Sequence, residues 1–135
     1  MKNRKVILDT NLWISFLISK NYTFLDSYVL NGKVKLVFSE ELFSEFISVA
    51  KRPKFKAFFS PNDDTKLISI INKFGVLYEI SSSVKNCRDE KDNFLLNLAI
   101  DSKADYLITG DSDLLDMKSI HKTKIITIKD LEYEL

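Results

Sequence analysis

The sequence predicts an α/β protein, a three-layer α/β/α sandwich around a central, mainly parallel sheet of five strands. Short apolar runs rich in Val and Ile alternate with segments whose apolar residues recur at helical spacing. This alternation is typical of strands joined by crossover helices. The 135 residues are 45% hydrophobic and include only 3 Gly and 2 Pro, which suits one core without long linkers. We therefore expect a single domain over residues 1–135.

The predicted strands are short and are bounded by polar residues or turn signals. Residues 5–8 form a continuous apolar run, as in a strand that is buried on both faces. Residues 33–38 alternate, with Val34, Leu36 and Phe38 on one side. The five predicted strands cover residues 5–8, 33–38, 76–80, 106–108 and 124–128.

Between the strands, apolar residues recur at the spacing of amphipathic helices. Ser39 is placed to cap the helix that follows it. Pro61 opens another helix, which Gly75 ends. The predicted helices cover residues 12–19, 22–30, 40–50, 61–74, 92–102 and 111–118.

Composition excludes several classes of function. The single Cys87 and the single His121 exclude a disulfide framework and a Cys/His zinc cage, and they fit a reduced, cytoplasmic setting. No apolar stretch approaches the roughly 18 residues that span a bilayer, so we expect no membrane partner. The net charge is +1, so a footprint for nucleic acid would have to be local.

Acidic side chains follow two of the predicted strands. Asp9 comes directly after residues 5–8, and Asp111 and Asp113 follow residues 106–108. Ligands of open parallel sheets bind beyond the carboxyl ends of the strands, where these residues should lie. Asp is also a common turn former and helix N-cap, and each residue taken alone fits that local role equally well.

Two further acids are less clear from the residues alone. Asp92 shares a helix face with the apolar Leu95, which predicts a carboxylate at the top of a buried face. It can equally be the N-cap of its own helix, and Asp89 is a second candidate cap. Glu45 lies roughly 130° from the centre of the apolar stripe of its helix, at about 100° per residue. That position favours a solvated surface Glu unless the functional edge lies beside the same flank.

A cluster of carboxylates needs a cation or raised pKa values, because the charges repel one another. Oxygen ligands suit Mg²⁺ or Mn²⁺ rather than zinc. Two such ions can activate a water and stabilise the leaving oxygen in phosphodiester hydrolysis. The sequence contains no G-x-G-x-x-G, P-loop or G-x-S-x-G motif, so nucleotide-cofactor sites and serine hydrolases are disfavoured.

The order of these motifs resembles the PIN-domain family, over nearly the whole chain. Within it, the chain resembles a bacterial or archaeal subfamily described as toxin components of toxin–antitoxin pairs. The segments that carry the resemblance are Asp9-Thr10-Asn11, residues 39–45 continuing into Lys51-Arg52-Pro53-Lys54-Phe55, residues 87–93, and residues 106–115.

The resemblance implies cleavage of single-stranded RNA with Mg²⁺ or Mn²⁺, leaving 5′-phosphate and 3′-hydroxyl ends. It implies that Thr10 and Asn11 help to shape the site, and that an antitoxin protein and a homodimer are possible partners. It raises Glu45 from a doubtful to a favoured candidate. The implied catalytic and metal-binding residues are Asp9, Glu45, Asp92, Asp111 and Asp113.

Lys51, Arg52 and Lys54 form a local basic segment that is a candidate for RNA binding. The alternative is a solvated helix end. Two other functions also stay open, a non-catalytic interaction module that keeps the fold and a housekeeping RNA-processing nuclease. A phosphotransfer receiver domain is discounted, because the third predicted strand ends in Ile80-Ser81 without an Asp.

Overall fold

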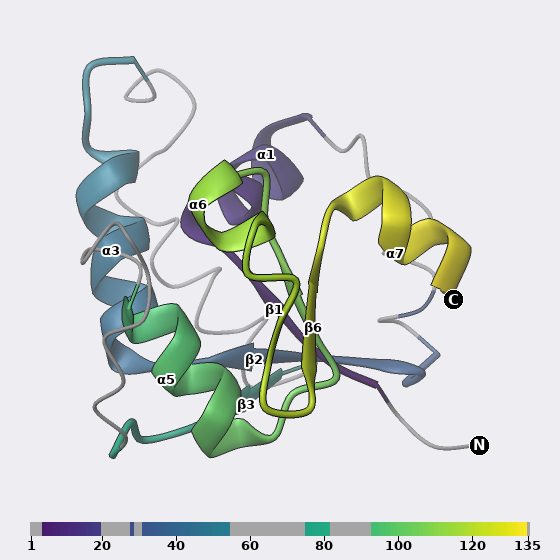
Figure 1. Ribbon diagram of the computed structural model, residues 1–135. Coiled ribbons are helices and arrows are strands. Elements are labelled where there is room, and N and C mark those ends of the chain that lie inside the picture. The colour runs from purple at the N-terminus through teal and green to yellow at the C-terminus, as the bar shows by residue number, and fades with distance from the viewer. Residues whose placement is uncertain (1–3, 20–27, 29–30, 55–74, 82–92, 135) are drawn as a thin grey trace.

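The computed structural model describes residues 4–19, 28, 31–54, 75–81 and 93–134. Within these ranges a six-stranded sheet has the order β3-β2-β1-β4-β6-β5, with helices packed around it (Figure 1). The expected α/β class with a mainly parallel sheet is confirmed. The predicted helices at 22–30 and 61–74 lie almost entirely outside the described residues, as does Asp92.

All five predicted strands are present, and every neighbouring pair among them is parallel. The sixth, β5, is a two-residue strand that pairs antiparallel with β6 at the sheet edge. The strands predicted at 76–80 and 124–128 are wrong at their ends, because the former stops at Leu77 and Ile128 begins a helix. The bounds are β1 (Arg4–Leu8), β2 (Val34–Phe38), β3 (Gly75–Leu77), β4 (Tyr106–Ile108), β5 (Ser119–Ile120) and β6 (Thr123–Ile126).

The helices follow the strands closely. The predicted cap of α3 is confirmed, since the Leu42 amide donates to the Ser39 hydroxyl over 3.1 Å. Helix α6 is shorter than predicted. Helix α7 was not predicted, and its start is fixed by the Asp130 amide, which donates to the Thr127 hydroxyl over 3.2 Å. The bounds are α1 (Thr10–Ser19), α3 (Glu40–Ala50), α5 (Asn93–Ser102), α6 (Ser112–Leu115) and α7 (Ile128–Glu134).

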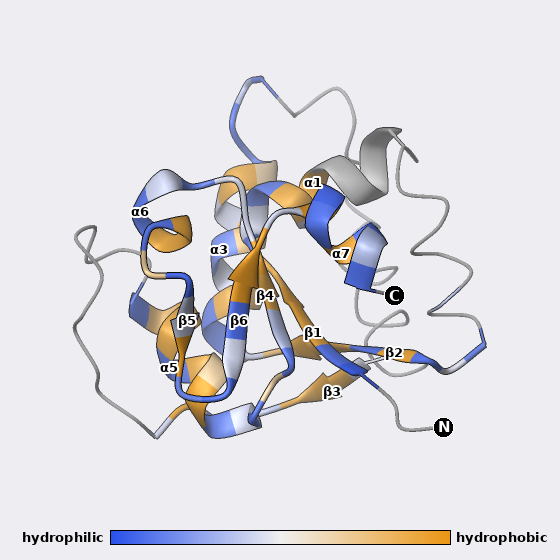
Figure 2. Cartoon of the chain, turned by 45° about the vertical axis from the view of Figure 1, so that its right-hand side comes forward, coloured by the Kyte–Doolittle hydropathy of each residue, from blue (hydrophilic) through white to orange (hydrophobic). Residues whose placement is uncertain are grey.

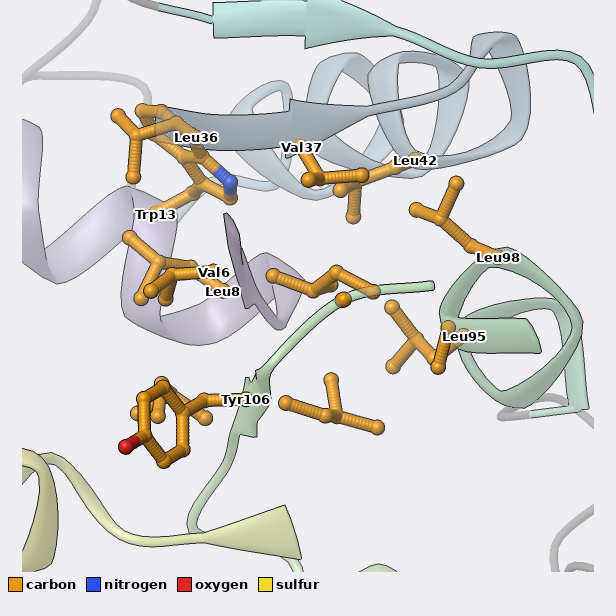
Figure 3. Packing of buried hydrophobic residues seen from close by; sticks show 14 of the residues in the cluster. Val6, Leu8, Trp13, Leu36, Val37, Leu42, Leu95, Leu98 and Tyr106 are labelled. Carbon is orange, nitrogen blue, oxygen red and sulfur yellow. The ribbon is translucent and has the colours of Figure 1, made fainter. Parts of the chain in front are cut away.

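The core fills both faces of the sheet, because alternate residues of each buried strand point to opposite faces. On one side, Trp13 of α1 packs edge-on against Phe38, with ring centroids 4.8 Å apart. On the other side, Val37 lies beside Leu42 of α3, with Leu95 and Leu98 of α5 beyond them in the same cluster (Figure 3). Hydrophobic residues accordingly follow the central strands (Figure 2). No helix in the described part of the chain is both long and apolar enough to cross a membrane.

The strand register decides which loops meet. Leu8 at the end of β1 pairs with Ile108 at the end of β4, so Asp9 and Thr109 are the next residues on two adjacent parallel strands. The Asp9 amide donates to the Ile108 carbonyl over 3.1 Å and continues the ladder by one step. This register brings together two segments that are 100 residues apart in the sequence.

Candidate active site

A cleft of about 470 Å³ opens at the carboxyl ends of β1 and β4. Its size falls within the roughly 300–1,000 Å³ of ordinary ligand sites. It is lined by the residues that directly follow β1 and β4, by the first turn of α1, and by residues of α3 and α5. The described lining residues are Asp9, Thr10, Asn11, Leu12, Glu45, Val49, Arg52, Leu95, Gly110 and Asp111.

Asp9 is a desolvated carboxylate at the base of this cleft, with 9% of its surface exposed. Its Oδ1 accepts from the Leu12 amide over 2.9 Å, and its Oδ2 accepts from the Thr109 hydroxyl over 2.5 Å. Burial raises the pKa of Asp9, and the charge of Asp111 raises it further, although hydrogen bonds from Thr109, Leu12 and Gly110 oppose the rise.

Asp111 is the N-cap of α6 and also a wall of the cleft. Its Oδ1 accepts from the Asp113 amide over 2.8 Å, which confirms the capping role. Because the residue also lines the cleft, the capping role and a ligand role are compatible. A carboxylate has about four lone-pair positions, and one hydrogen bond leaves others for a ligand.

Thr109 connects the two acids, and the sequence analysis did not select it. Its hydroxyl donates to Asp9 Oδ2 and accepts from the Asp111 amide over 3.0 Å. The side chain is 1% exposed, so the hydroxyl has little water to replace these partners. The signal that could have identified Thr109 was a hydroxyl residue directly after a strand, two residues before Asp111. The neighbouring strand β1 ends directly before Asp9.

Glu45 is exposed and lines the cleft from α3. Its helix geometry placed it on a flank of the apolar stripe, and that flank faces the functional edge. Of the three basic candidates, Arg52 lines the cleft, whereas Lys51 and Lys54 are exposed and lie outside the lining residues.

The remaining expected residues fall into two groups. Thr10 is buried, Asn11 is exposed, and both line the cleft as expected for residues that shape a site. Asp113 is half-buried and does not line it, although its amide contacts Asp111. Asp92 lies outside the described residues, and so does its alternative Asp89.

The donor chemistry fits a hard cation. The side chains at the opening offer carboxylate and amide oxygens, which are the ligands of Mg²⁺ and Mn²⁺. Burial disfavours the charged form of the Asp9 carboxylate, and a bound cation would stabilise that form. Within the described residues, no group of three or more Asp, Glu, His or Cys side chains is arranged to hold a metal ion.

A parallel sheet with an acidic cleft at its carboxyl edge defines an α/β domain whose candidate ligand site lies beyond the strand ends. The chain belongs to the PIN domain family, whose model matches residues 5–113. The match includes the segments that carry Asp9, Glu45 and Asp111.

The chain is also similar to another protein in sequence and to solved structures in fold. Uncharacterized protein MJ1680 from Methanocaldococcus jannaschii is 31% identical over 122 residues, which cover 87% of this chain and 77% of the relative. The PIN domain endonuclease Utp24 has a similar fold, with a TM-score of 0.58 and 16% identity, covering 92% of this chain and 84% of that one. VapBC2 from Rickettsia felis, solved bound to a DNA fragment from its promoter, has a similar fold, with a TM-score of 0.53 and 17% identity. The match covers 90% of this chain and 96% of that one.

Proposed function

We infer that this protein is a metal-dependent endoribonuclease that hydrolyses phosphodiester bonds of single-stranded RNA with Mg²⁺ or Mn²⁺. One observation carries the proposal. The Thr109 hydroxyl holds the Asp9 carboxylate and the Asp111 backbone in one cleft, and Glu45 lines the same cleft from α3. The endonuclease Utp24, whose fold is similar, supports the reaction class.

We assign metal binding to Asp9, Glu45, Asp92, Asp111 and Asp113. Asp92 directly precedes Asn93, the first residue of α5, and Leu95 of that helix lines the cleft. When bound, the ions would activate the attacking water and stabilise the leaving oxygen. This chain's own residues position the ligands, since Thr109 orients one oxygen of Asp9 and leaves fewer rotamers open to it.

The other residues of the opening shape and charge it. Thr10 and Asn11 form the edge that follows Asp9. Arg52 brings a positive charge to the cleft, and Lys51 and Lys54 extend that charge along the exposed end of α3. Phosphate contacts of this kind fix the register of a nucleic acid without reading its sequence.

Asp9→Asn tests the assignment directly. The substitution keeps the size of the side chain and removes its charge, so we expect loss of RNA cleavage in Mn²⁺ with unchanged circular dichroism. Asp130→Asn is a matched control on α7, away from the residues that line the cleft, and it should cleave like the parent. Equal cleavage by the Asp9→Asn protein and the parent would contradict the assignment.

A non-catalytic interaction module is the second candidate. One observation favours it, namely that the described acids do not form a group of three able to hold a metal. Calorimetric titration with Mn²⁺ separates the two candidates. The nuclease should bind the ion and lose that binding in Asp9→Asn, whereas the module should show no Asp9-dependent binding.

We further propose that the nuclease is the toxin of a toxin–antitoxin pair in the cytoplasm, with an antitoxin protein as partner and a homodimer as a possible assembly. The motif resemblance supports this role, and the similar fold of VapBC2 is compatible with it. A housekeeping RNA-processing role is the alternative. Induced expression in a bacterial host distinguishes them, since the toxin should arrest growth and the Asp9→Asn protein should not.

A further inference from the structure

The far wall of the cleft is one face of α3, continued by one turn. Glu45, Val49 and Arg52 are spaced i, i+4 and i+7, so they lie on one side of a helix. The turn continues past Ala50, because the Lys51 amide donates to the Ile47 carbonyl over 3.2 Å and the Arg52 amide to the Val49 carbonyl over 3.1 Å. The order along this wall is therefore acid, apolar residue, base.

Arg52 differs from the neighbouring basic residues in its surroundings. It is the one cationic side chain among the described residues that line the cleft, and three carboxylates line the same cleft. Seven residues of helix rise about 10 Å, which separates the Cα atoms of Arg52 and Glu45 along the wall. The Lys124–Glu134 ion pair joins β6 and α7 and does not involve Arg52. The Arg52 guanidinium is thus available to an anion.

Three apolar residues also line the cleft. Leu12 is partly exposed, whereas Val49 and Leu95 are only 3% and 2% exposed. An apolar lining suits the ribose and base of a nucleotide rather than a phosphate. An RNA strand crossing the cleft with one phosphate at the acids would place a neighbouring phosphate farther along the wall. Arg52 is the group suited to that second phosphate, because guanidinium binds phosphate oxygens in a bidentate manner.

We propose that Arg52 binds the phosphate next to the one that is cleaved, with the intervening nucleoside lying against the exposed part of Leu12. This proposal rests on the proposed nuclease function of the same cleft. It makes Arg52 a substrate-positioning residue, with Lys51 and Lys54 peripheral to the contact. It also sets a minimal substrate, because a dinucleotide without a terminal phosphate leaves the guanidinium without its partner.

Dinucleotides with and without a terminal phosphate test the contact, with the phosphate placed on the 5′ end or on the 3′ end. In the parent protein with Mn²⁺, one of the two phosphates should raise kcat/KM about tenfold, as expected of a charge-assisted hydrogen bond. In Arg52→Ala the increase should vanish, and in Arg52→Lys part of it should remain, since lysine keeps the charge without the fork.

Arg4→Ala is the matched control, because Arg4 is exposed at the opposite end of β1 from Asp9. It should retain the tenfold phosphate effect. The proposal is overturned if Arg52→Ala also retains the effect. It is equally overturned if Lys51→Ala or Lys54→Ala loses as much of the effect, since a diffuse basic patch would then be the cause.

Binding without metal separates this inference from the proposed function. In EDTA, a 5′- or 3′-phosphorylated dinucleotide should shift the NMR signals of the Arg52 guanidinium, and the shifts along residues 45–52 should disappear in Arg52→Ala. Such shifts in a protein that cleaves no RNA would remove the nuclease assignment and keep the anion site. Cleavage with a phosphate effect independent of Arg52 would keep the nuclease assignment and remove the anion site at Arg52.

Discussion

Replacing Thr109 with Val removes one hydroxyl and keeps the shape of the side chain. The lost hydroxyl donates to the Asp9 carboxylate over 2.5 Å and accepts from the Asp111 amide over 3.0 Å. Because Thr109 is 1% exposed, water cannot easily replace it. The variant therefore leaves a buried carboxylate with one donor fewer and a half-buried amide without its acceptor.

The free energy of unfolding should fall by about 3 kcal/mol at neutral pH. The hydrogen bond to a charged group contributes about 1.5–3 kcal/mol, and the orphaned amide costs about 1 kcal/mol. Thr109 also lowers the pKa of Asp9, so the variant should have a still higher pKa there. The stability difference between parent and variant should consequently shrink in acid, where the carboxyl is protonated in both.

Thr123→Val is the matched control for this variant. Thr123 is also 1% exposed, and its hydroxyl donates to the Ala104 carbonyl over 2.6 Å, at the opposite end of the sheet from the cleft. It should lower the free energy of unfolding by about 1–2 kcal/mol without changing cleavage. Urea unfolding gives the stabilities, and RNA cleavage in Mn²⁺ gives the activities.

Thr109→Val should lower cleavage about 10- to 100-fold, as expected when a residue that orients a metal ligand is lost. Thr109→Ser, which keeps the hydroxyl, should recover most of the activity. If Thr109→Val and Thr123→Val lost stability but cleaved equally well, Thr109 would be a packing residue and our account of the cleft would be wrong.

Three further predictions follow from the same structure. Burial raises the pKa of Asp9 above its ordinary value of 3.8, so between these two pKa values the folded chain binds more protons than the unfolded chain. The free energy of unfolding therefore falls as the pH rises through this window. In urea unfolding, the stability of Asp9→Asn relative to the parent should accordingly increase with pH across the same window. Ser39→Ala removes the cap of α3 and should lower the free energy of unfolding by about 1 kcal/mol. An unchanged free energy of unfolding would mean that another group satisfies the Leu42 amide. Asp92→Asn should abolish cleavage while circular dichroism stays unchanged, and full activity would remove Asp92 from the site.

Strand positions were predictable because the relevant signals are local. The β-branched run at residues 5–8 and the alternation around Leu36 need no knowledge of the rest of the chain. Ser39 was recognisable as a cap for the same reason. The missed α7 begins after a β-branched run, where Thr127 provides a cap for a helix of seven residues. A helix that short carries too little periodicity to compete with the strand signal before it.

The site was predictable in part. Acids that follow strands must reach the carboxyl edge of a parallel sheet, so Asp9 and Asp111 were found from order alone. Glu45 could not be placed, because the apolar stripe of a helix shows which side faces the core and not what lies beside its flank. Arg52 was indistinguishable from Lys51 and Lys54 until the cleft was defined.

The amino-acid sequence by itself determined the strands, most of the helix starts and the types of residue available for chemistry, since each depends on neighbours within a few positions. Only the tertiary structure decided which of these residues meet. The parallel register of β1 against β4 sets Asp9 beside Thr109 across 100 residues of sequence, and the packing of α3 turns one flank toward them. Contacts of such range depend on the joint packing of the whole sheet, which local propensity does not encode.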